Sequence, residues 1–176
     1  IICFNRPQYL ETQLEVLRLV KPSTIYLACD GERIEHPSDK EKINAVRRGY
    51  EKGIDWKCEL HTNFSNSNLG CSKGPISAMT WFFSEVEKGI ILEDDIVVNK
   101  NFLSQMNYFL EKFNKNKKIA SIEGYMYPVN FRKDIPDYFF LKGTGCWGWA
   151  TWKRPWKNYE GSVDKLLKNF SAKKKL

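Results

Sequence analysis

Three carboxylates stand side by side at the end of an apolar run, where Glu93, Asp94 and Asp95 follow the segment GIIL at residues 89–92. A short run of continuous hydrophobicity is typical of a central buried strand. Carboxylates at the end of such a strand lose hydration and repel one another, so their ionised forms are costly unless a cation offsets them. Oxygen ligands of this kind suit Mg²⁺ or Mn²⁺, with phosphate oxygens and water completing the shell. The triplet therefore predicts a site for a divalent metal and a phosphate-bearing ligand.

The same three acids have a simpler interpretation as a polar turn before a helix. A helix is expected over residues 99–116, and the helix dipole favours negative charge near its N-terminus. An acidic cluster of three residues is a weak motif by itself. Its position directly after a buried strand is what favours the metal site.

The composition is that of a folded globular domain with an anionic partner. The 176 residues suffice for one domain with a core, and 42% hydrophobic with 14% aromatic residues argue against disorder. No apolar run approaches the roughly 20 residues of a membrane-spanning helix. The formal net charge of +7 suggests nucleic acid, phosphorylated small molecules or acidic membranes as partners. Because the chain opens inside a strand-like run, we expect truncation at one or both ends. The sequence does not decide whether an N-terminal targeting segment exists.

The cysteines do not form a disulfide framework or a structural zinc site. There are five of them, widely spaced and without a CxxC pair. A reducing, cytoplasmic setting fits this usage, and the inner face of the membrane is compatible with it.

Strands and helices are expected to alternate along the chain. Strands are predicted at 1–4, 24–29, 58–63, 89–95 and 119–129. Helices are predicted after Pro7, over 40–53, from Pro75 and over 99–116. Alternation with short connections predicts an α/β layered fold with a largely parallel sheet.

Polar residues collect where this sheet should bind a ligand. Open parallel sheets bind ligands at the carboxyl ends of their strands. The unusual residues fall at those ends: Asn5-Arg6, Asp30-Gly31, the loop 64–74 and the acidic triplet. From about residue 130 the chain becomes aromatic, glycine-bearing and irregular, which indicates a second half of the site laid over the sheet.

The acidic triplet resembles the Asp-x-Asp metal motif of glycosyltransferases with the GT-A fold, in the Glu-Asp-Asp form of the N-acetylglucosaminyltransferase I group and related bacterial family 2-like transferases. Four further segments agree in order and spacing: IICFNRP (1–7), LACDG (27–31), NLGCSKGPISAMTWFF (68–83) and GCWGWATWKRPW (145–156). The resemblance implies a three-layer, Rossmann-like nucleotide-diphospho-sugar transferase sandwich with a mostly parallel central sheet. It implies one domain over 1–176, with a nucleotide-binding half at 1–100 and an acceptor-side half at 101–176.

The resemblance also implies an activity and a set of roles. The reaction would be a metal-dependent, inverting transfer of a sugar from a nucleoside-diphosphate donor, expected to be UDP-linked, to a hydroxyl of a glycan or other acceptor. Asp95 would bind Mn²⁺ or Mg²⁺, and Trp147 and Trp149 would contact the acceptor. The catalytic base would be Glu160 or Asp164, a choice that the sequence leaves open. The nucleotide-sugar would be bound by Asn5, Arg6, Asp30, Lys73, Glu93 and Asp94.

These positions also have structural interpretations. Asn5-Arg6 with Pro7 could cap the first helix, and Asp30-Gly31 could form an ordinary turn. Lys73 could be a solvated loop lysine, and Glu160 and Asp164 surface acids. The tryptophans could be core residues, because aromatic side chains usually pack.

Three other functions compete with the transferase. A nucleotidyltransferase should carry a glycine-rich phosphate loop after its first strand, and CFNRPQYL lacks the glycines. A nucleic-acid-binding module needs basic and aromatic residues interleaved on one surface, whereas here acids cluster where the pocket should be. A non-catalytic sugar-binding module would bind carbohydrate without metal or nucleotide. We expect no nucleic-acid partner; the basic charge leaves peripheral membrane association open, and the sequence does not determine the oligomeric state.

Overall fold

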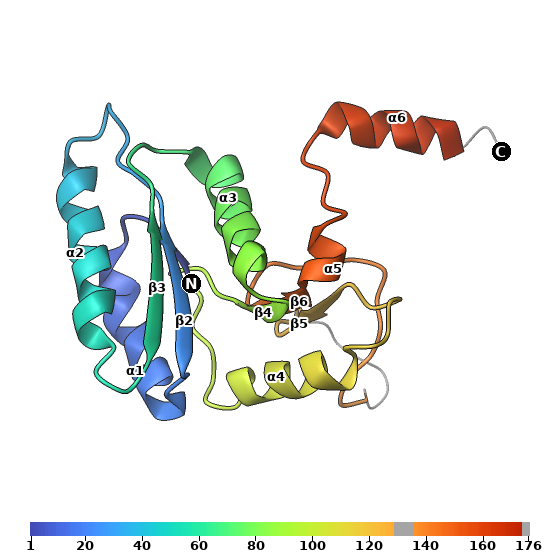
Figure 1. Ribbon diagram of the computed structural model, residues 1–176, viewed down its shortest axis with the longest axis horizontal. Coiled ribbons are helices and arrows are strands. Elements are labelled where there is room, and N and C mark those ends of the chain that lie inside the picture. The colour runs from blue at the N-terminus through green and yellow to red at the C-terminus, as the bar shows by residue number, and fades with distance from the viewer. Residues whose placement is uncertain (129–135, 174–176) are drawn as a thin grey trace.

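The computed structural model describes residues 1–128 and 136–173, and its strands form two sheets of three (Figure 1). The first sheet is parallel, in the order β1-β2-β3, and consists of β1 (Ile2–Cys3), β2 (Thr24–Cys29) and β3 (Glu59–Phe64). The second is antiparallel, in the order β4-β6-β5, and consists of β4 (Lys88–Ile91), β6 (Trp149–Trp152) and β5 (Ser121–Glu123).

The two sheets meet where β1 lies beside the end of β4. The backbone N–H of Ile2 donates to the carbonyl of Leu92 at 2.8 Å, and Ile2 forms an isolated parallel bridge with Glu93. The strands thus follow one another in space as β3-β2-β1-β4-β6-β5. From β1 the chain runs outward to β2 and β3, then crosses back to β4 on the other side of β1. The point between β1 and β4 is therefore the topological switch point, where open α/β sheets bind ligands.

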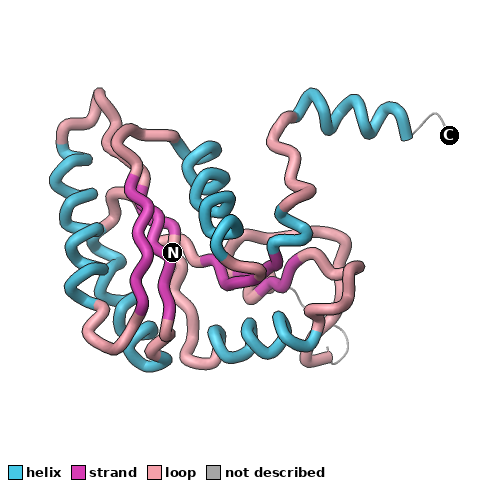
Figure 2. The backbone as a smooth tube through the Cα atoms, in the orientation of Figure 1, coloured by secondary structure: helices cyan, strands magenta, loops and turns pink. Residues whose placement is uncertain are grey.

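Helices cover both faces of the parallel sheet. Figure 1 shows α1 and α2 on one side of β2 and β3 and α3 on the other. In Figure 2 the two groups of strands are coloured magenta and the helices cyan. A further helix, α4, packs on the second sheet, and α6 lies apart from both sheets. The helices are η1 (Pro7–Tyr9), α1 (Leu10–Val20), α2 (Ser38–Gly53), α3 (Gly70–Glu85), α4 (Phe102–Lys112), α5 (Lys153–Trp156) and α6 (Val163–Lys173).

Two apolar cores hold these layers together. Leu14 and Leu17 of α1 and Val46 of α2 pack with Leu27 of the parallel sheet. The second core consists of Leu92, Phe102, Met106, Leu110, Ala150 and Trp152. The helix expected over 99–116 is shorter, because α4 spans Phe102–Lys112. Its residues Phe102, Met106 and Leu110 lie in the second core, and Phe109 and Phe113 lie in a half-buried aromatic cluster beside it.

Some predicted element boundaries were wrong. The helix predicted to begin at Pro75 begins at Gly70, and Pro75 lies inside it, because its N-terminus is capped by a residue distant in sequence, Asp30. The predicted strand 119–129 shortens to β5, and its last residue lies outside the described part of the chain.

The segment 145–156 was expected to be irregular and instead contains β6 and α5. Its WATW residues pair with the whole of β4, from Lys88 opposite Trp152 to Ile91 opposite Trp149. Gly89 of β4 lets α3 pack closely on this strand, since a β-carbon there would lie 2.2 Å from the Phe82 ring of α3. The C-terminal part of the chain thus contributes a strand that pairs with β4, just before the acidic triplet.

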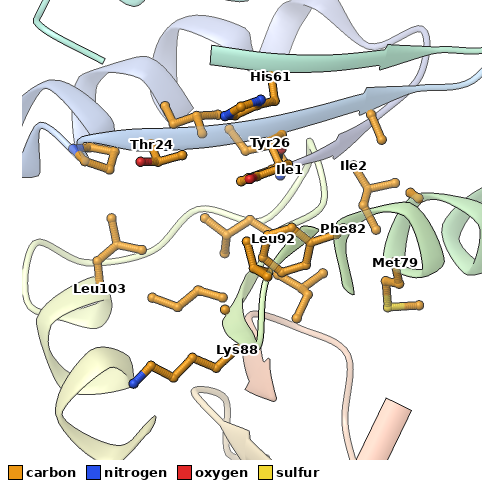
Figure 3. Close-up of a pocket in the computed structure, with 18 of the residues that line it drawn as sticks. Ile1, Ile2, Thr24, Tyr26, His61, Met79, Phe82, Lys88, Leu92 and Leu103 are labelled. Atoms are coloured by element: carbon orange, nitrogen blue, oxygen red, sulfur yellow. Dashed lines mark hydrogen bonds between the residues drawn. The ribbon is translucent and has the colours of Figure 1, made fainter. Parts of the chain in front are cut away.

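An apolar cavity of about 550 Å³ lies between the start of β2 and β4 (Figure 3). Tyr26, Phe82, Leu92 and Leu103 are among the residues that line it. The backbone nitrogen of Ile1 donates to the carbonyl of Tyr26 at 2.7 Å. None of the predicted site residues lines this cavity.

In the described residues, no helix combines the length and apolar character that crossing a bilayer requires.

Candidate active site

Arg6 joins the end of β1 to the acidic triplet at the switch point. Its Nη2 lies 2.6 Å from Asp94 Oδ1, and its Nη1 lies 2.5 Å from Asp95 Oδ2. The backbone N–H of Phe4 donates to Asp94 Oδ2 at 2.9 Å. The structure thus brings together Arg6, Asp94 and Asp95, as the sequence predicted from the carboxyl ends of the strands.

The triplet carries more negative charge than Arg6 offsets. Asp94 is 3% exposed, and burial raises its pKa while the Phe4 N–H and the Arg6 guanidinium oppose that rise. Glu93 is half-buried, and burial followed by the Asp95 carboxylate raises its pKa. Three ionised carboxylates and one guanidinium leave a local charge of −2. Such a site is stabilised by a further cation.

Two carboxylates of the triplet keep oxygen atoms that are available beside Arg6. Asp94 Oδ1 is buried and lies in ion-pair contact with Arg6 without a well-aligned hydrogen bond, so it keeps accepting capacity. Asp95 is 37% exposed and can be reached from solvent. Across residues 1–128 and 136–173 no three His, Cys, Asp or Glu side chains form a metal-binding group. Mg²⁺ is commonly held by one or two carboxylates with phosphates and water.

Gln13 of α1 and Tyr50 of α2 form a buried, hydrogen-bonded pair that holds the backbone at the triplet. Gln13 Nε2 donates to the carbonyls of Glu93 at 2.8 Å and Ile96 at 3.2 Å, and Gln13 Oε1 accepts from the Tyr50 hydroxyl. Sequence reasoning missed both residues. The available signal was a glutamine on the apolar face of α1, between Leu10 and Leu17.

Asn5 points toward α2. Its Nδ2 donates to Asp39 Oδ1 at 2.6 Å, and Arg33 donates to both oxygens of the same carboxylate, at 2.7 and 3.0 Å. Asp39 is 1% exposed, and the hydrogen bonds from Arg33 and then Asn5 hold its pKa well below its usual range. This network ties the loop after β1 to α2. Sequence reasoning missed Asp39, which looks like an ordinary first-turn acid.

Asp30 caps α3. Its Oδ1 accepts from Leu69 N at 2.9 Å, and its Oδ2 accepts from Gly70 N at 3.1 Å and from Asn68 Nδ2 at 3.1 Å. A carboxylate at this end of a helix is favoured by the dipole. Gly31 lets the loop after β2 approach the loop before α3, because a β-carbon at residue 31 would lie 2.4 Å from the Ser67 backbone. The contact of Asp30 with a nucleobase stays a prediction.

The predicted acceptor residues lie beside the triplet. Trp149 in β6 is paired with Ile91, two residues before Glu93. Burial and then the Glu93 carboxylate raise the pKa of Cys146, so the preceding loop also lies within electrostatic range of the triplet. Trp147 is 48% exposed and packs against Tyr125, with ring centroids 4.8 Å apart. An exposed aromatic surface of this kind can stack on a sugar ring.

In the described part of the chain, no hydrogen bond or ion pair joins the remaining predicted residues to the triplet. Lys73 is exposed in the first turn of α3. Glu160 accepts from Ser162 N at 2.9 Å, which lowers its pKa, and Lys165 lies 3.4 Å from its other oxygen. Asp164 lies in the first turn of α6, which extends away from both sheets (Figure 1). The structure does not bring either candidate base to the triplet, so their roles stay predictions.

Comparison with known proteins decides the class of the chain. The family described as glycosyltransferase family 25 (LPS biosynthesis protein) matches residues 6–140, which are 135 of the 176 residues. A search of curated proteins finds no match. The resemblance expected from the sequence is confirmed for the enzyme class and for sugar donor and acceptor as substrates, whereas the family differs from the two groups named there. The chain belongs to glycosyltransferase family 25 and is a glycosyltransferase.

Proposed function

We propose that this glycosyltransferase moves a sugar from a nucleoside diphosphate, with UDP the expected nucleotide, to an acceptor hydroxyl at the switch point between β1 and β4. The observation that carries the proposal is the partly buried triplet, whose charge Arg6 offsets only in part. A divalent cation offsets the remaining negative charge of such a site, and the same cation can bind the phosphate oxygens of the donor.

The GT-A sandwich is part of this proposal. Its support is the strand order β3-β2-β1-β4, parallel throughout, with helices on both faces and the antiparallel β6 beside β4. The halves 1–100 and 101–176 belong to the proposal as well. The first half supplies Arg6 and the triplet, and the second supplies β6 with Trp149.

Mg²⁺ or Mn²⁺ would be held by Asp95, with Asp94 beside it, and would supply Lewis-acid stabilisation of the leaving diphosphate. Arg6 presents two N–H groups that now contact carboxylates and that suit phosphate oxygens equally well. Lys73, on the first turn of α3, adds positive charge at the carboxyl end of the parallel sheet. Glu93 and Asp94 orient the hydroxyls of the ribose and the donor sugar.

The acceptor lies on the β6 side in this proposal. Trp147 offers an exposed ring, and Tyr125 and Tyr127 pack against it, at 4.8 and 5.7 Å between centroids. Glu160 or Asp164 takes the proton of the attacking hydroxyl, a contribution of roughly 10²- to 10⁴-fold in rate. The reaction is expected to invert the sugar carbon. Comparing Glu160→Gln with Asp164→Asn in a transfer assay identifies the base.

Calorimetry tests the donor site. UDP, GDP and CDP are titrated into the chain with Mn²⁺ or with chelator. We expect UDP to bind most tightly, and its binding to weaken strongly with chelator or in Asp95→Ala. Asp55→Ala is the matched control, since Asp55 is an exposed acid that only approaches Arg18 at 3.8 Å. Equal UDP binding with and without metal would contradict the proposal.

A further inference from the structure

Half-buried and exposed aromatic rings meet at the C-terminal end of α4. The rings of Phe109 and Phe113 stack with centroids 5.9 Å apart, and Tyr138 packs edge-on against Phe109 at 5.3 Å. Phe140 packs against Phe113 at 5.7 Å. Figure 1 shows the chain after residue 136, in orange, beside the C-terminal end of α4. We call these rings, with Phe139, Leu141 and the lysines named below, the aromatic–lysine surface.

The outer part of this surface is unusually apolar. Phe140 is 65% exposed and Leu141 is 78% exposed, and Tyr138 and Phe139 on the same strip are also exposed. Single exposed apolar residues are common on proteins, whereas a contiguous strip marks a contact surface. The strip YFFL ends at Lys142.

Lysines lie beside the strip and on the turn that follows α4. Lys112 lies with its Nζ 4.4 Å above the Tyr138 ring, and Lys115, Lys117 and Lys118 are exposed on the turn that follows α4. This turn is closed by the N–H of Asn116 donating to the carbonyl of Phe113 at 2.9 Å. Residues 108–118 and 136–142 hold five lysines and two acids, Glu111 and Asp137, a net charge of +3. Glu111 is already paired with Lys88 at 2.5 Å.

We propose that the aromatic–lysine surface docks the enzyme onto an anionic membrane. Phe140 and Leu141 would enter the boundary between headgroups and acyl chains, Tyr138 would lie at headgroup level, and the lysines would meet anionic headgroups. The charge complementarity and the mixture of apolar tips with tyrosine and lysine favour this occupant. A nucleic acid would favour aromatic rings interleaved with basic side chains, whereas the most exposed residues of this strip, Phe140 and Leu141, carry no polar group. The proposal is independent of the donor and metal proposed above.

Vesicle sedimentation tests this surface. The chain is mixed with phosphatidylcholine vesicles that contain about a third phosphatidylglycerol, or none, in low and high salt. We expect binding to the anionic vesicles only, weakened by salt because exposed charges are screened. Each surface lysine contributes about fivefold to such binding, so Lys115→Gln, Lys117→Gln and Lys118→Gln together should weaken it roughly 100-fold. Phe140→Ser with Leu141→Ser should abolish binding at high salt.

The control removes three exposed lysines of α2: Lys40→Gln, Lys42→Gln and Lys52→Gln. This variant should bind as the wild type does, and thermal melts establish that every variant is folded. Loss of binding in the control as large as in the α4 variant would overturn the proposal. So would the absence of vesicle binding by the wild type, or a wild-type dimer that Phe140→Ser and Leu141→Ser dissociate while vesicle binding stays unchanged.

Discussion

Arg6→Ala removes the guanidinium that offsets the triplet. Asp94 then keeps a single hydrogen bond, from Phe4 N, in a site where 3% of the residue is exposed. Asp95 loses its partner but remains in contact with solvent. The expected result is a less stable protein, because a buried carboxylate without its cation is costly.

The size of the effect follows from burial. Removing one partner of a fully buried ion pair costs roughly 3–5 kcal/mol. The Arg6 side chain is 38% exposed, so water can replace part of its stabilisation of the carboxylates. We therefore expect the free energy of unfolding to fall by about 2 kcal/mol at neutral pH. For a chain of this size, that lowers Tm by roughly 4–8 °C. Because burial raises the pKa of Asp94, acidification protonates it and the deficit should shrink as pH falls.

Urea and thermal denaturation in chelator measure this difference between pH 7 and 5. Arg48→Ala is the control, since the exposed Arg48 side chain donates to a carbonyl of its own helix, that of Asn44. The control should stay within about 0.5 kcal/mol of the wild type. An Arg6→Ala protein as stable as the control at pH 7, or a deficit that grows in acid, would refute the reasoning.

Two further predictions concern the supports of the site. Asp30→Ala removes the cap of α3 and should cost about 1–2 kcal/mol, with faster hydrogen exchange of the Leu69 and Gly70 amides; unchanged exchange there would show that the cap is dispensable. The lowered pKa of Asp39 stabilises the fold at pH values above its ordinary pKa of about 3.8, and this stabilisation is lost as pH falls below it. The gap in unfolding free energy between wild type and Asp39→Asn should therefore narrow from pH 7 to pH 3, and a constant gap would be inconsistent with that network.

Much of the fold near the site could be predicted from local patterns. β2 occupies the predicted residues 24–29, because its apolar, β-branched run is bounded by Pro22 and by Asp30. The stripe of Phe102, Met106 and Leu110 was readable from helical spacing. The place of Arg6 beside Asp94 and Asp95 followed from the rule that carboxyl ends of parallel strands share one edge.

The predictions that failed concern structure that depends on contacts between residues distant in sequence. The start of α3 is set by Asp30, about 40 residues earlier, and not by its own Pro75. The strand WATW was hidden among glycines and tryptophans, and it forms because β4 offers it a pairing edge. Gln13 supports the triplet from 80 residues away. Local propensity carries no information about such partners.

Paramagnetic broadening by Mn²⁺ tests the central claim most directly. With UDP present, Mn²⁺ should broaden the amide signals of Phe4, Arg6 and Asp95 first and leave those of Gly53 and Ile54, which precede β3 at the other end of the sheet, unchanged. Asp95→Ala should abolish this pattern. Broadening that spares the Phe4 and Asp95 amides, or that persists unchanged in Asp95→Ala, would contradict a metal–diphosphate site at the triplet.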